Sequence, residues 1–266
     1  MQPLGVIGSL SRDFVDGAPP RPGGAVVYAA RALRALGSRA VVVTKCAAEH
    51  RADLLPRLVE VGLPVSWRPA AATTAFSFSY DGERRTMRVD AVGDPWGADV
   101  AIDRLLAGVR WLHVGALLRS EFAPEVLERL ARGRVLSLDG QALVRPARVG
   151  PLELDRDFDP QLLAHVTILK LSEEETRAAV GEIAAERIDE LGVPEVVVTL
   201  GTQGSLVFAR GRSQRIQVGA VAGADPTGAG DSFAAAYLAA RSSGDAPVGA
   251  ARRACSVVSA LLRGRR

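Results

Sequence analysis

The sequence predicts an α/β protein whose mostly parallel sheet is covered by helices on both faces. Short apolar runs of strand length alternate along the chain with segments of helix length. The runs are apolar at nearly every position, which is typical of strands that are buried on both faces. The chain of 266 residues is long enough for one large domain. We therefore expect a single domain over residues 1–266, with ligands bound beyond the carboxyl ends of the strands.

The first part of the chain follows this alternation closely. Strands are expected at Leu4–Ser9, Ala40–Thr44 and Val65–Arg68, with helices at Ala25–Leu36 and Arg51–Val61. Gly37 and Gly62 directly follow the two helices. Glycine just past the last helical turn is a common helix stop, so both helix ends are well marked.

Residues 73–92 break the alternation. Thr73–Tyr80 and Arg84–Val92 alternate apolar and polar side chains, and Asp81-Gly82 between them is a strong signal for a tight turn. We expect an antiparallel β-lid, inserted between two α/β units at about residues 65–92. The alternative is that the same hairpin forms an edge of the main sheet.

The remaining part returns to the alternation and ends in two helices. Further strands are expected at Trp111–Val114, Val135–Leu138, Val166–Leu171 and Glu195–Leu200. A second hairpin, Ser205–Ala209 with Ser213–Val218, precedes helices at Ala229–Arg241 and Val248–Leu262. Both helices are rich in small residues, so we expect them to pack tightly on the sheet.

Charge and composition argue against several classes of protein. The 33 basic and 30 acidic residues are interspersed and only 5% of residues are aromatic, whereas a nucleic-acid binder needs a concentrated basic face with stacking partners. No apolar run approaches the roughly 20 residues of a membrane helix, and the first residues lack the basic start of a signal peptide. Cys46 and Cys255 lack metal-ligand spacing, which is typical of free thiols in a reducing compartment. We expect a cytoplasmic protein that binds neither nucleic acid nor membranes.

The most informative segment is Gly223–Phe233. Gly228 and Gly230 frame a sharp turn directly before a helix, where converging backbone N–H groups and the helix dipole favour an anion. Asp231 lies beside this anion site in the first helical turn. It could be a simple N-terminal charge, or it could take a proton from a hydroxyl that attacks a phosphate. The length of the whole string favours the second interpretation.

This string resembles the C-terminal signature of the ribokinase-like (PfkB) carbohydrate kinases. Asp225–Phe233 matches the family pattern D-x-T-G-A-G-D-x-F at every fixed position. The resemblance implies a three-layer α/β/α fold with a small β-lid, and phosphorylation of a hydroxyl group by ATP with Mg²⁺. It implies an anion hole from the amides of Gly228, Ala229 and Gly230, a catalytic base in Asp231 and a nucleotide contact from Thr227.

The acceptor side of that family's site resembles the N-terminal part of the chain. Gly23-Gly24 before a helix resembles the family's Gly-Gly motif, and Asp13 matches an Asp that hydrogen-bonds the sugar, although it could also be a solvated loop charge. Tyr28 stands where the family has Asn, which implies an acceptor pocket different from that of ribokinase. The lid resembles one that closes over the acceptor, and this family's lid can also serve as the interface of a homodimer.

A further stretch resembles the myo-inositol kinase-like members. Leu138–Arg145 is similar to their D-x-Q-G-x-x-R pattern, with Ala142 in place of Gly, and Tyr28 also fits that branch. Arg145 could reach a phosphate or a substrate hydroxyl, and the same interpretation applies to Arg88 on the lid. A solvated loop arginine is the alternative for either one. The favoured acceptor is a sugar or polyol similar to myo-inositol.

Two elements resemble the family's nucleotide side. Thr199–Gly204 matches T-x-G-x-x-G, which implies that Thr199, Gly201 and Gly204 lie beside ATP. Lys170–Glu175 matches the N-x-x-E element, except that Ser172 replaces Asn. The resemblance implies that Lys170 and Ser172 contact the nucleotide, and that Glu175 orders water on Mg²⁺. Ser172 could equally be the N-cap of the following helix.

Three alternatives compete with a sugar or polyol kinase. A Rossmann-type oxidoreductase is disfavoured, because Gly5–Gly8 does not have the G-x-G-x-x-G pattern. A nucleoside kinase of the same fold shares the chemistry and differs in the acceptor. A non-catalytic sugar- or nucleotide-binding protein would explain the two replaced asparagines, in a chain that contains no asparagine at all. It would not explain an intact Asp231 beside its anion site.

Overall fold

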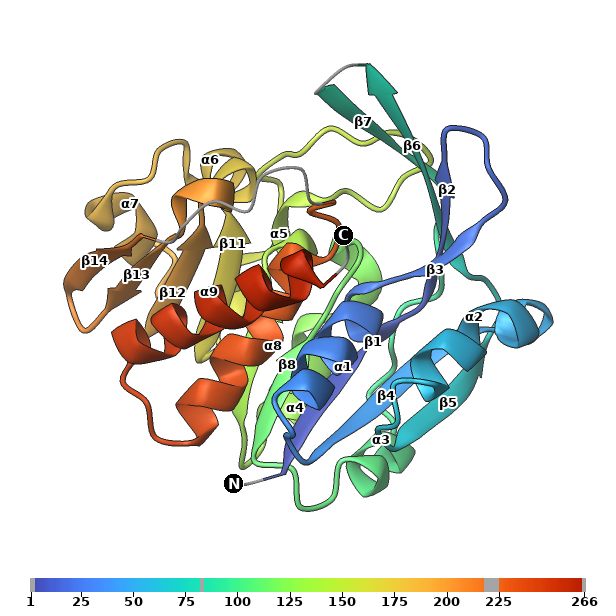
Figure 1. The fold of residues 1–266 in the computed structure, drawn as a ribbon, viewed down its shortest axis with the longest axis horizontal. Helices are drawn as coiled ribbons and strands as arrows, with labels where there is room; N and C mark the ends of the chain where they lie inside the picture. The colour runs from blue at the N-terminus through green and yellow to red at the C-terminus, as the bar shows by residue number, and fades with distance from the viewer. Residues whose placement is uncertain (1–2, 82–83, 218–224, 265–266) are drawn as a thin grey trace.

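The computed structural model describes residues 3–81, 84–217 and 225–264, which form two β-sheets. The larger sheet has the strand order β14-β13-β12-β11-β9-β8-β1-β4-β5 (Figure 1). Its strands are β1 (Leu4–Ser9), β4 (Ala40–Ala47), β5 (Val65–Ala70), β8 (Trp111–Val114), β9 (Val135–Asp139), β11 (Ile168–Ser172), β12 (Glu195–Thr199), β13 (Ser205–Ala209) and β14 (Arg212–Ile216). Neighbouring strands from β12 to β5 pair in parallel, and β13 and β14 pair antiparallel. The mostly parallel sheet is confirmed.

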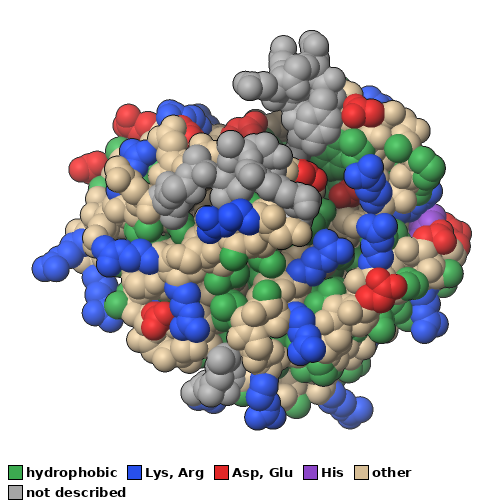
Figure 2. Space-filling model, viewed as in Figure 1, with side chains coloured by type: hydrophobic (Ala, Val, Ile, Leu, Met, Phe, Trp, Pro, Cys, Tyr) green, Lys and Arg blue, Asp and Glu red, His purple; other side chains and the backbone are tan. Residues whose placement is uncertain are grey.

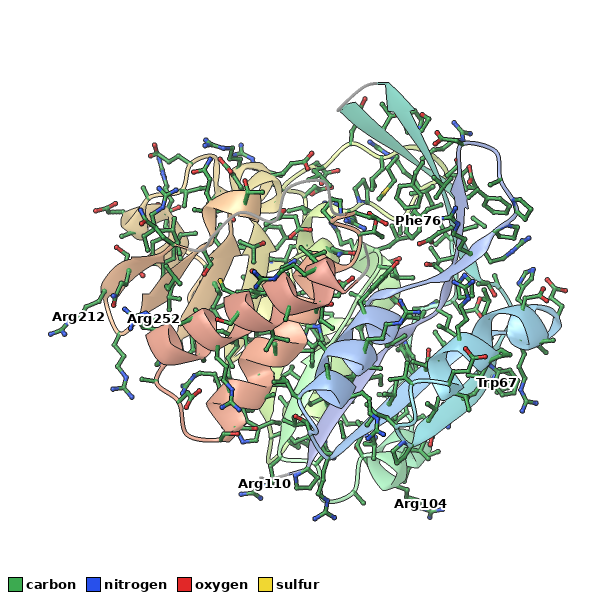
Figure 3. All side chains as sticks on the ribbon, in the orientation of Figure 1. Trp67, Phe76, Arg104, Arg110, Arg212 and Arg252 are labelled. Atoms are coloured by element: carbon green, nitrogen blue, oxygen red, sulfur yellow. The ribbon has the colours of Figure 1, made fainter. Side chains whose placement is uncertain are left out.

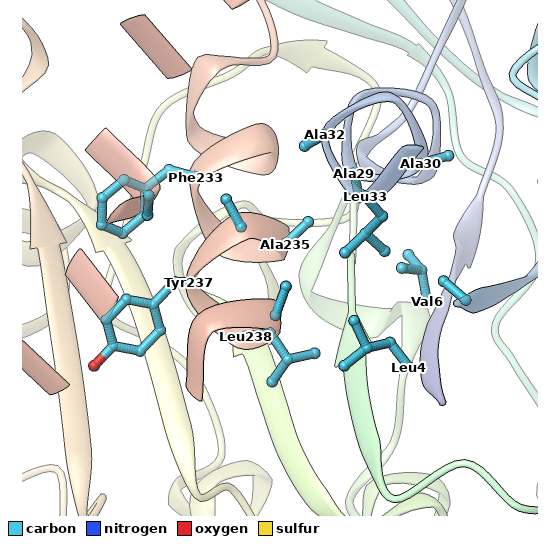
Figure 4. Packing of buried hydrophobic residues seen from close by; sticks show 14 of the residues in the cluster. Leu4, Val6, Ala29, Ala30, Ala32, Leu33, Phe233, Ala235, Tyr237 and Leu238 are labelled. Atoms are coloured by element: carbon cyan, nitrogen blue, oxygen red, sulfur yellow. The ribbon is translucent and has the colours of Figure 1, made fainter. Parts of the chain in front are cut away.

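Helices cover both faces of this sheet, because its strands carry apolar side chains on both faces. One face carries α1 (Ala25–Ala35), α2 (Arg51–Val59), α8 (Ala229–Ser242) and α9 (Pro247–Arg263). The other face carries α3 (Val100–Leu105), α4 (Pro124–Ala131), α6 (Glu173–Val180) and α7 (Ala185–Asp189), while the short α5 (Gln141–Val144) follows β9. On the first face, α1 and α8 pack through small side chains such as Ala29, Ala32 and Ala235 (Figure 4). Small residues let these two helices approach closely.

The second sheet is the lid, with the strand order β10-β7-β6-β2-β3. Its strands are β2 (Ser11–Val15), β3 (Arg21–Gly23), β6 (Thr74–Asp81), β7 (Arg84–Ala91) and β10 (Gly150–Pro151). The predicted hairpin is confirmed as β6 and β7, and its turn residue Gly82 lies outside the described residues. The hairpin is part of a separate sheet, so the alternative of an edge in the main sheet is wrong.

The predicted lid boundaries of about 65–92 need correction. Val65–Ala70 is β5, which pairs with β4 at the edge of the main sheet. The lid instead recruits β2, β3 and β10, which the sequence pattern did not predict. Only Leu10 separates β1 from β2, so the chain passes from one sheet to the other almost without a loop. β2 pairs in parallel with β6, which makes the lid a mixed sheet where a purely antiparallel flap was expected.

Two expectations, on membrane-spanning helices and on the distribution of charge, can be compared with the described part of the chain. No helix described there is long and apolar enough to cross a membrane. Lys and Arg side chains are scattered over the face seen in Figure 2, with acidic side chains between them. The predicted homodimer through the lid stays a prediction.

Candidate active site

A cavity of about 1130 Å³ opens where the lid meets the carboxyl ends of the main-sheet strands. The predicted site residues that line it are Asp13, Gly24, Tyr28, Arg145, Lys170, Ser172, Glu175, Thr227, Gly228, Gly230 and Asp231. The predicted site residues that do not line it are Gly23, Arg88, Ala229, Thr199, Gly201 and Gly204. The fold thus brings residues from both ends of the chain to one place.

The loop before α8 has the backbone conformation expected of an anion site. Gly228 is the N-cap of α8 and has left-handed backbone angles, φ 72° and ψ 11°. The Ala229 N–H donates to the carbonyl of Pro226 at 2.9 Å, so this predicted member of the anion hole is already engaged. No acceptor within the described ranges takes up the N–H of Gly228 or Gly230. These two amides are therefore the ones open to a bound anion.

Charged side chains cluster beneath this loop. Lys170, near the end of β11, is buried, and its Nζ lies 3.4 Å from Asp139 Oδ2 and 3.8 Å from Glu175 Oε2. A Cβ atom on Gly230 would lie 2.9 Å from the same Nζ, so the lysine lies directly against the backbone of the anion loop. Asp231 follows in the first turn of α8 and opens onto the cavity.

The pKa values of this cluster reflect burial and mutual attraction. Burial, together with repulsion from Asp139, raises the pKa of Asp231 to about 7, against the attraction of Lys170 and Arg145. Burial alone would lower the pKa of Lys170, but attraction by Asp139, Glu175 and Asp231 outweighs it and raises that pKa. A carboxylate with a pKa near neutrality beside a fixed cation has the properties of a general base.

His113 on β8 is also buried, yet its surroundings keep it neutral. Burial and then repulsion by Lys170 lower the pKa of His113 to about 3. Its Nδ1 lies 3.2 Å from the Oγ of Ser137, within the sheet. His113 does not line the cavity. Asp231 is therefore the better candidate for the base.

Ser172 and Glu175 form a capping box at the start of α6. The Glu175 N–H donates to Ser172 Oγ at 3.1 Å, and the Ser172 N–H donates to Glu175 Oε2 at 2.8 Å. This confirms the N-cap interpretation of Ser172. Glu175 Oε2 is thereby held at the helix N-terminus and near Lys170, while both residues still line the cavity.

The acceptor side is built from the lid and the start of α1. Asp13 lies on β2, where its Oδ1 accepts a hydrogen bond from Ser11 Oγ at 2.7 Å. The loop-charge interpretation of Asp13 is wrong, because the residue is part of a strand that lines the cavity. A Cβ atom on Gly23 would lie only 2.0 Å from Asp13 Oδ2, so glycine there makes room for the carboxylate. Gly24, at φ 103°, is the N-cap of α1.

An apolar wall lies beside these polar groups on the same lid sheet, where Asp13 of β2 is the register partner of Phe76 of β6. Phe76, Phe78 and Met87 come from β6 and β7, and Leu117 and Leu152 come from loops below them (Figure 3 labels Phe76). Arg88 is not part of this wall. Arg88 lies on the face of β7 opposite to Met87, because neighbouring residues of a strand face opposite sides. Its half-exposed side chain forms an ion pair at 3.4 Å with Asp90, which lies two residues on and on the same face.

The T-x-G-x-x-G element lies one strand farther from the cavity. Thr199 ends β12 beside Ser172 of β11, and its Oγ1 donates to the carbonyl of Leu171 at 3.3 Å. Gly204 has φ 93° and packs against the backbone of Ile216, where any side chain would collide. In this structure Gly204 has a structural role, because it allows the chain to pass close to the backbone of Ile216.

Asp139 and Gln141 were not predicted as site residues. Asp139 is fully buried at the end of β9, faces Lys170 and contributes to the raised pKa of Asp231. Its Oδ1 accepts from the N–H of Gln141, which lines the cavity. The signal was present in the sequence: Asp139 directly follows an apolar strand, where the carboxyl ends of a parallel sheet meet.

Comparisons with known proteins identify the family of this chain. Residues 20–265 match the model of the pfkB family of carbohydrate kinases. Inositol 3-kinase of Oryza sativa subsp. japonica is 33% identical over 185 residues, which cover 63% of this chain and 44% of that protein. Inositol 3-kinase of Zea mays is 32% identical over 162 residues, covering 59% and 40%. The chain spans less than half the length of these curated relatives.

Solved structures share the whole fold. A pyrophosphate-dependent kinase in the ribokinase family, in a sulfate complex, aligns with a TM-score of 0.85 and 25% identity, over 98% of this chain and 95% of that one. Arabidopsis thaliana ribokinase complexed with ribose and ATP aligns with a TM-score of 0.74 and 18% identity, over 98% and 93%. With the family model matched over nearly the full length, this chain belongs to the pfkB family of carbohydrate kinases.

Proposed function

We propose that the protein transfers a phosphoryl group to a hydroxyl of a small polyol, with Asp231 as the base. The observation that carries this proposal is the position of Asp231. Its carboxylate, with a pKa raised to about 7, lies at the cavity wall beside the open amides of Gly228 and Gly230. A base beside an anion hole supplies two of the parts that in-line phosphoryl transfer uses.

In the proposed step, the acceptor oxygen attacks the terminal phosphorus of the donor while Asp231 takes the hydroxyl proton. A phosphorus–oxygen bond to the acceptor forms, and the bond to the rest of the donor breaks. The Gly228 and Gly230 amides and the Lys170 ammonium stabilise the charge on the transferred group. Asp139 and Glu175 keep Lys170 charged and in place.

We favour a cyclitol similar to myo-inositol as the acceptor. Ser11 and Asp13 present polar groups to the cavity, while Phe78 and Met87 present an apolar wall. A cyclitol has the matching chemistry, with hydroxyls around its rim and carbon-bound hydrogens on its faces. The similarity to the plant inositol 3-kinases supports this class of acceptor.

We propose ATP with Mg²⁺ as the donor. Mg²⁺ is usually bound through one or two carboxylates together with the phosphates of the substrate. Glu174 and Glu175 line the cavity and fit such a role through water, although the described residues contain no cluster that would hold a metal by itself. When bound, Mg²⁺ would neutralise charge on the donor phosphates.

Pyrophosphate is a second candidate donor, and one observation favours it. Among the described residues, Lys170, Thr227 and Gly228 line the cavity, but Thr199, Gly201 and Gly204 do not. The cavity thus contacts Lys170 and Thr227, which are expected at the donor, and the Gly228 amide expected to hold phosphate, but it does not reach the T-x-G-x-x-G element expected beside ATP. A solved structure of similar fold, a pyrophosphate-dependent kinase in the ribokinase family at 25% identity, supports the same donor.

A donor-by-acceptor assay tests the proposal. The purified protein is given Mg²⁺ with ATP or pyrophosphate, and inositols, hexoses, sugar acids or nucleosides, and phosphorylated products are measured by mass spectrometry. We expect phosphorylated inositol with one of the two donors. Phosphorylated nucleoside alone would support the nucleoside kinase. Donor binding without turnover of any acceptor would support a non-catalytic binding protein and overturn the proposal.

A further inference from the structure

The ring of Tyr28 lies directly on the anion loop. A Cβ atom on Gly228 would be 2.1 Å from both Cγ and Cδ1 of Tyr28, so the aromatic ring occupies the space where any other residue would place its side chain. Tyr28 comes from the first turn of α1, and Gly228 precedes α8. Two segments 200 residues apart in the sequence therefore meet at the point where the anion site begins.

The position of this ring is fixed by the packing of α1 on α8. Ala29 and Ala32 of α1 and Ala235 of α8 belong to the same buried cluster, in which small side chains let the helices approach closely (Figure 4). The Oγ of Ser232 donates to the backbone carbonyl of Tyr28 at 3.4 Å. The helix that carries the ring is thus tied to the helix that begins at the anion loop.

Gly228 has left-handed backbone angles, which determine where its own N–H and that of Gly230 point. In an empty loop, a glycine can leave this conformation at little cost, because it has many alternatives. A flat ring packed on its Cα removes those alternatives. The ring is large enough for this, whereas the carboxamide of the asparagine that the family usually has at this position is flat but too small to cover the glycine.

We infer that Tyr28 is a positioning residue that holds Gly228 in its left-handed conformation and so preorganises the anion hole for the donor phosphate. This inference rests on the proposed function and deepens it, because it moves Tyr28 from reading the acceptor to supporting the donor site. This role requires the aromatic ring of Tyr28 and does not require its phenol hydroxyl.

The test is the affinity for a donor anion measured without any acceptor. Isothermal titration with imidodiphosphate and Mg²⁺ is performed on the wild type, Tyr28→Phe and Tyr28→Asn. We expect Tyr28→Phe to bind as the wild type does. Tyr28→Asn restores the family's residue, yet we expect it to bind about tenfold more weakly, because charge-assisted hydrogen bonds from the loop are lost. Equal affinity of Tyr28→Asn and the wild type would overturn the inference.

A double-mutant cycle guards against a general loss of folding. Gly228→Ala adds the methyl group that the Tyr28 ring excludes, so it should weaken anion binding strongly in the wild type. In the Tyr28→Ala background the space is open, and the same change should cost about fivefold less. Equal costs in both backgrounds would contradict the contact. Anion binding is measured without turnover, so its outcome is separate from that of the kinase assay.

Discussion

Lys45 and Lys170 are the only lysines of the chain, and both are buried near the carboxyl end of a strand in the same sheet. Their surroundings nevertheless shift their pKa values in opposite directions. Burial lowers the pKa of Lys45 and outweighs the attraction of Glu121 and Asp94. At Lys170, the attraction of three carboxylates outweighs burial and raises the pKa. Burial alone therefore does not decide the direction in which the pKa of a buried lysine shifts; the attraction of the facing carboxylates also does.

The two lysines also serve different parts of the protein. Lys45 Nζ donates to the carbonyl of Asp94 at 2.5 Å and lies 4.8 Å from the centre of the Trp96 ring. The Asp94 carboxylate accepts hydrogen bonds from the N–H groups of Ala71 and Ala72. Through Asp94, Lys45 therefore holds together the two connections between the main sheet and the β6–β7 hairpin. One connection contains Ala71 and Ala72 and precedes β6, and the other contains Asp94 and follows β7. Lys170 instead faces the anion loop, where a permanent positive charge is useful for phosphate.

The sharpest way to break this comparison is to remove the base from the Lys170 cluster. Asp231→Asn keeps the shape of the side chain but removes its capacity to accept a proton. We expect turnover to fall by about 10²- to 10⁴-fold, while the affinity for the donor is retained. Turnover is measured with the acceptor that the donor-by-acceptor assay identifies. Asp103→Asn, the same change on α3 away from the cavity, should leave turnover unchanged; near-normal turnover of Asp231→Asn would exclude Asp231 as the base.

Lys170→Met should have the larger effect on stability of the two lysine substitutions. It leaves Asp139, Glu175 and Asp231 facing one another without the buried cation that all three share. Removing one partner of a buried ion pair typically costs about 3–5 kcal/mol of the free energy of unfolding. The measurement is urea unfolding followed by circular dichroism. A loss below about 1 kcal/mol, the size expected for an exposed pair, would show that the cluster is not held by Lys170.

Lys45→Met is the matched substitution and should cost much less. The variant loses the hydrogen bond to Asp94, worth about 1 kcal/mol, but keeps a long apolar stem and a sulfur atom against Trp96. Glu121 is left without a nearby cation, yet burial already raises the pKa of Glu121, so the acid can take up a proton. In the same urea unfolding experiment, an equal loss of the free energy of unfolding in the two variants would show that Lys45 and Lys170 contribute equally to stability.

Much of the fold and of the site could be predicted from the sequence. The strands of the main sheet are continuous apolar runs, and the Gly228–Asp231 turn has a pattern specific enough to point to the candidate site at the lid-side cavity. Strand β2 was missed because SRDFV has no clear alternation and only Leu10 separates it from β1. One of its two pairing partners, β6, lies more than 50 residues away, where local patterns carry no information.

The site residues also divide into those that local motifs predict and those whose role depends on tertiary contacts. Local motifs identified Asp231, while the orientation of Arg88 depends on which face of β7 turns to the cavity. The engagement of the Ala229 amide with Pro226 depends on loop geometry. The role of Asp139 appears only when β9 and β11 pair and place it beside Lys170. These features are consequences of tertiary contacts, which single segments do not encode by themselves.

The pKa of Asp231 decides whether this carboxylate can act as the base near neutral pH. Carbon-13 NMR titration of the Asp carboxyl groups in the ligand-free protein measures it, with the Asp231→Asn variant identifying the resonance. The account predicts a midpoint near pH 7, because burial and Asp139 oppose ionisation. Since only the ionised form accepts a proton, turnover should rise with pH across the same range. A midpoint near about 4, the ordinary value for an aspartate, would contradict the account.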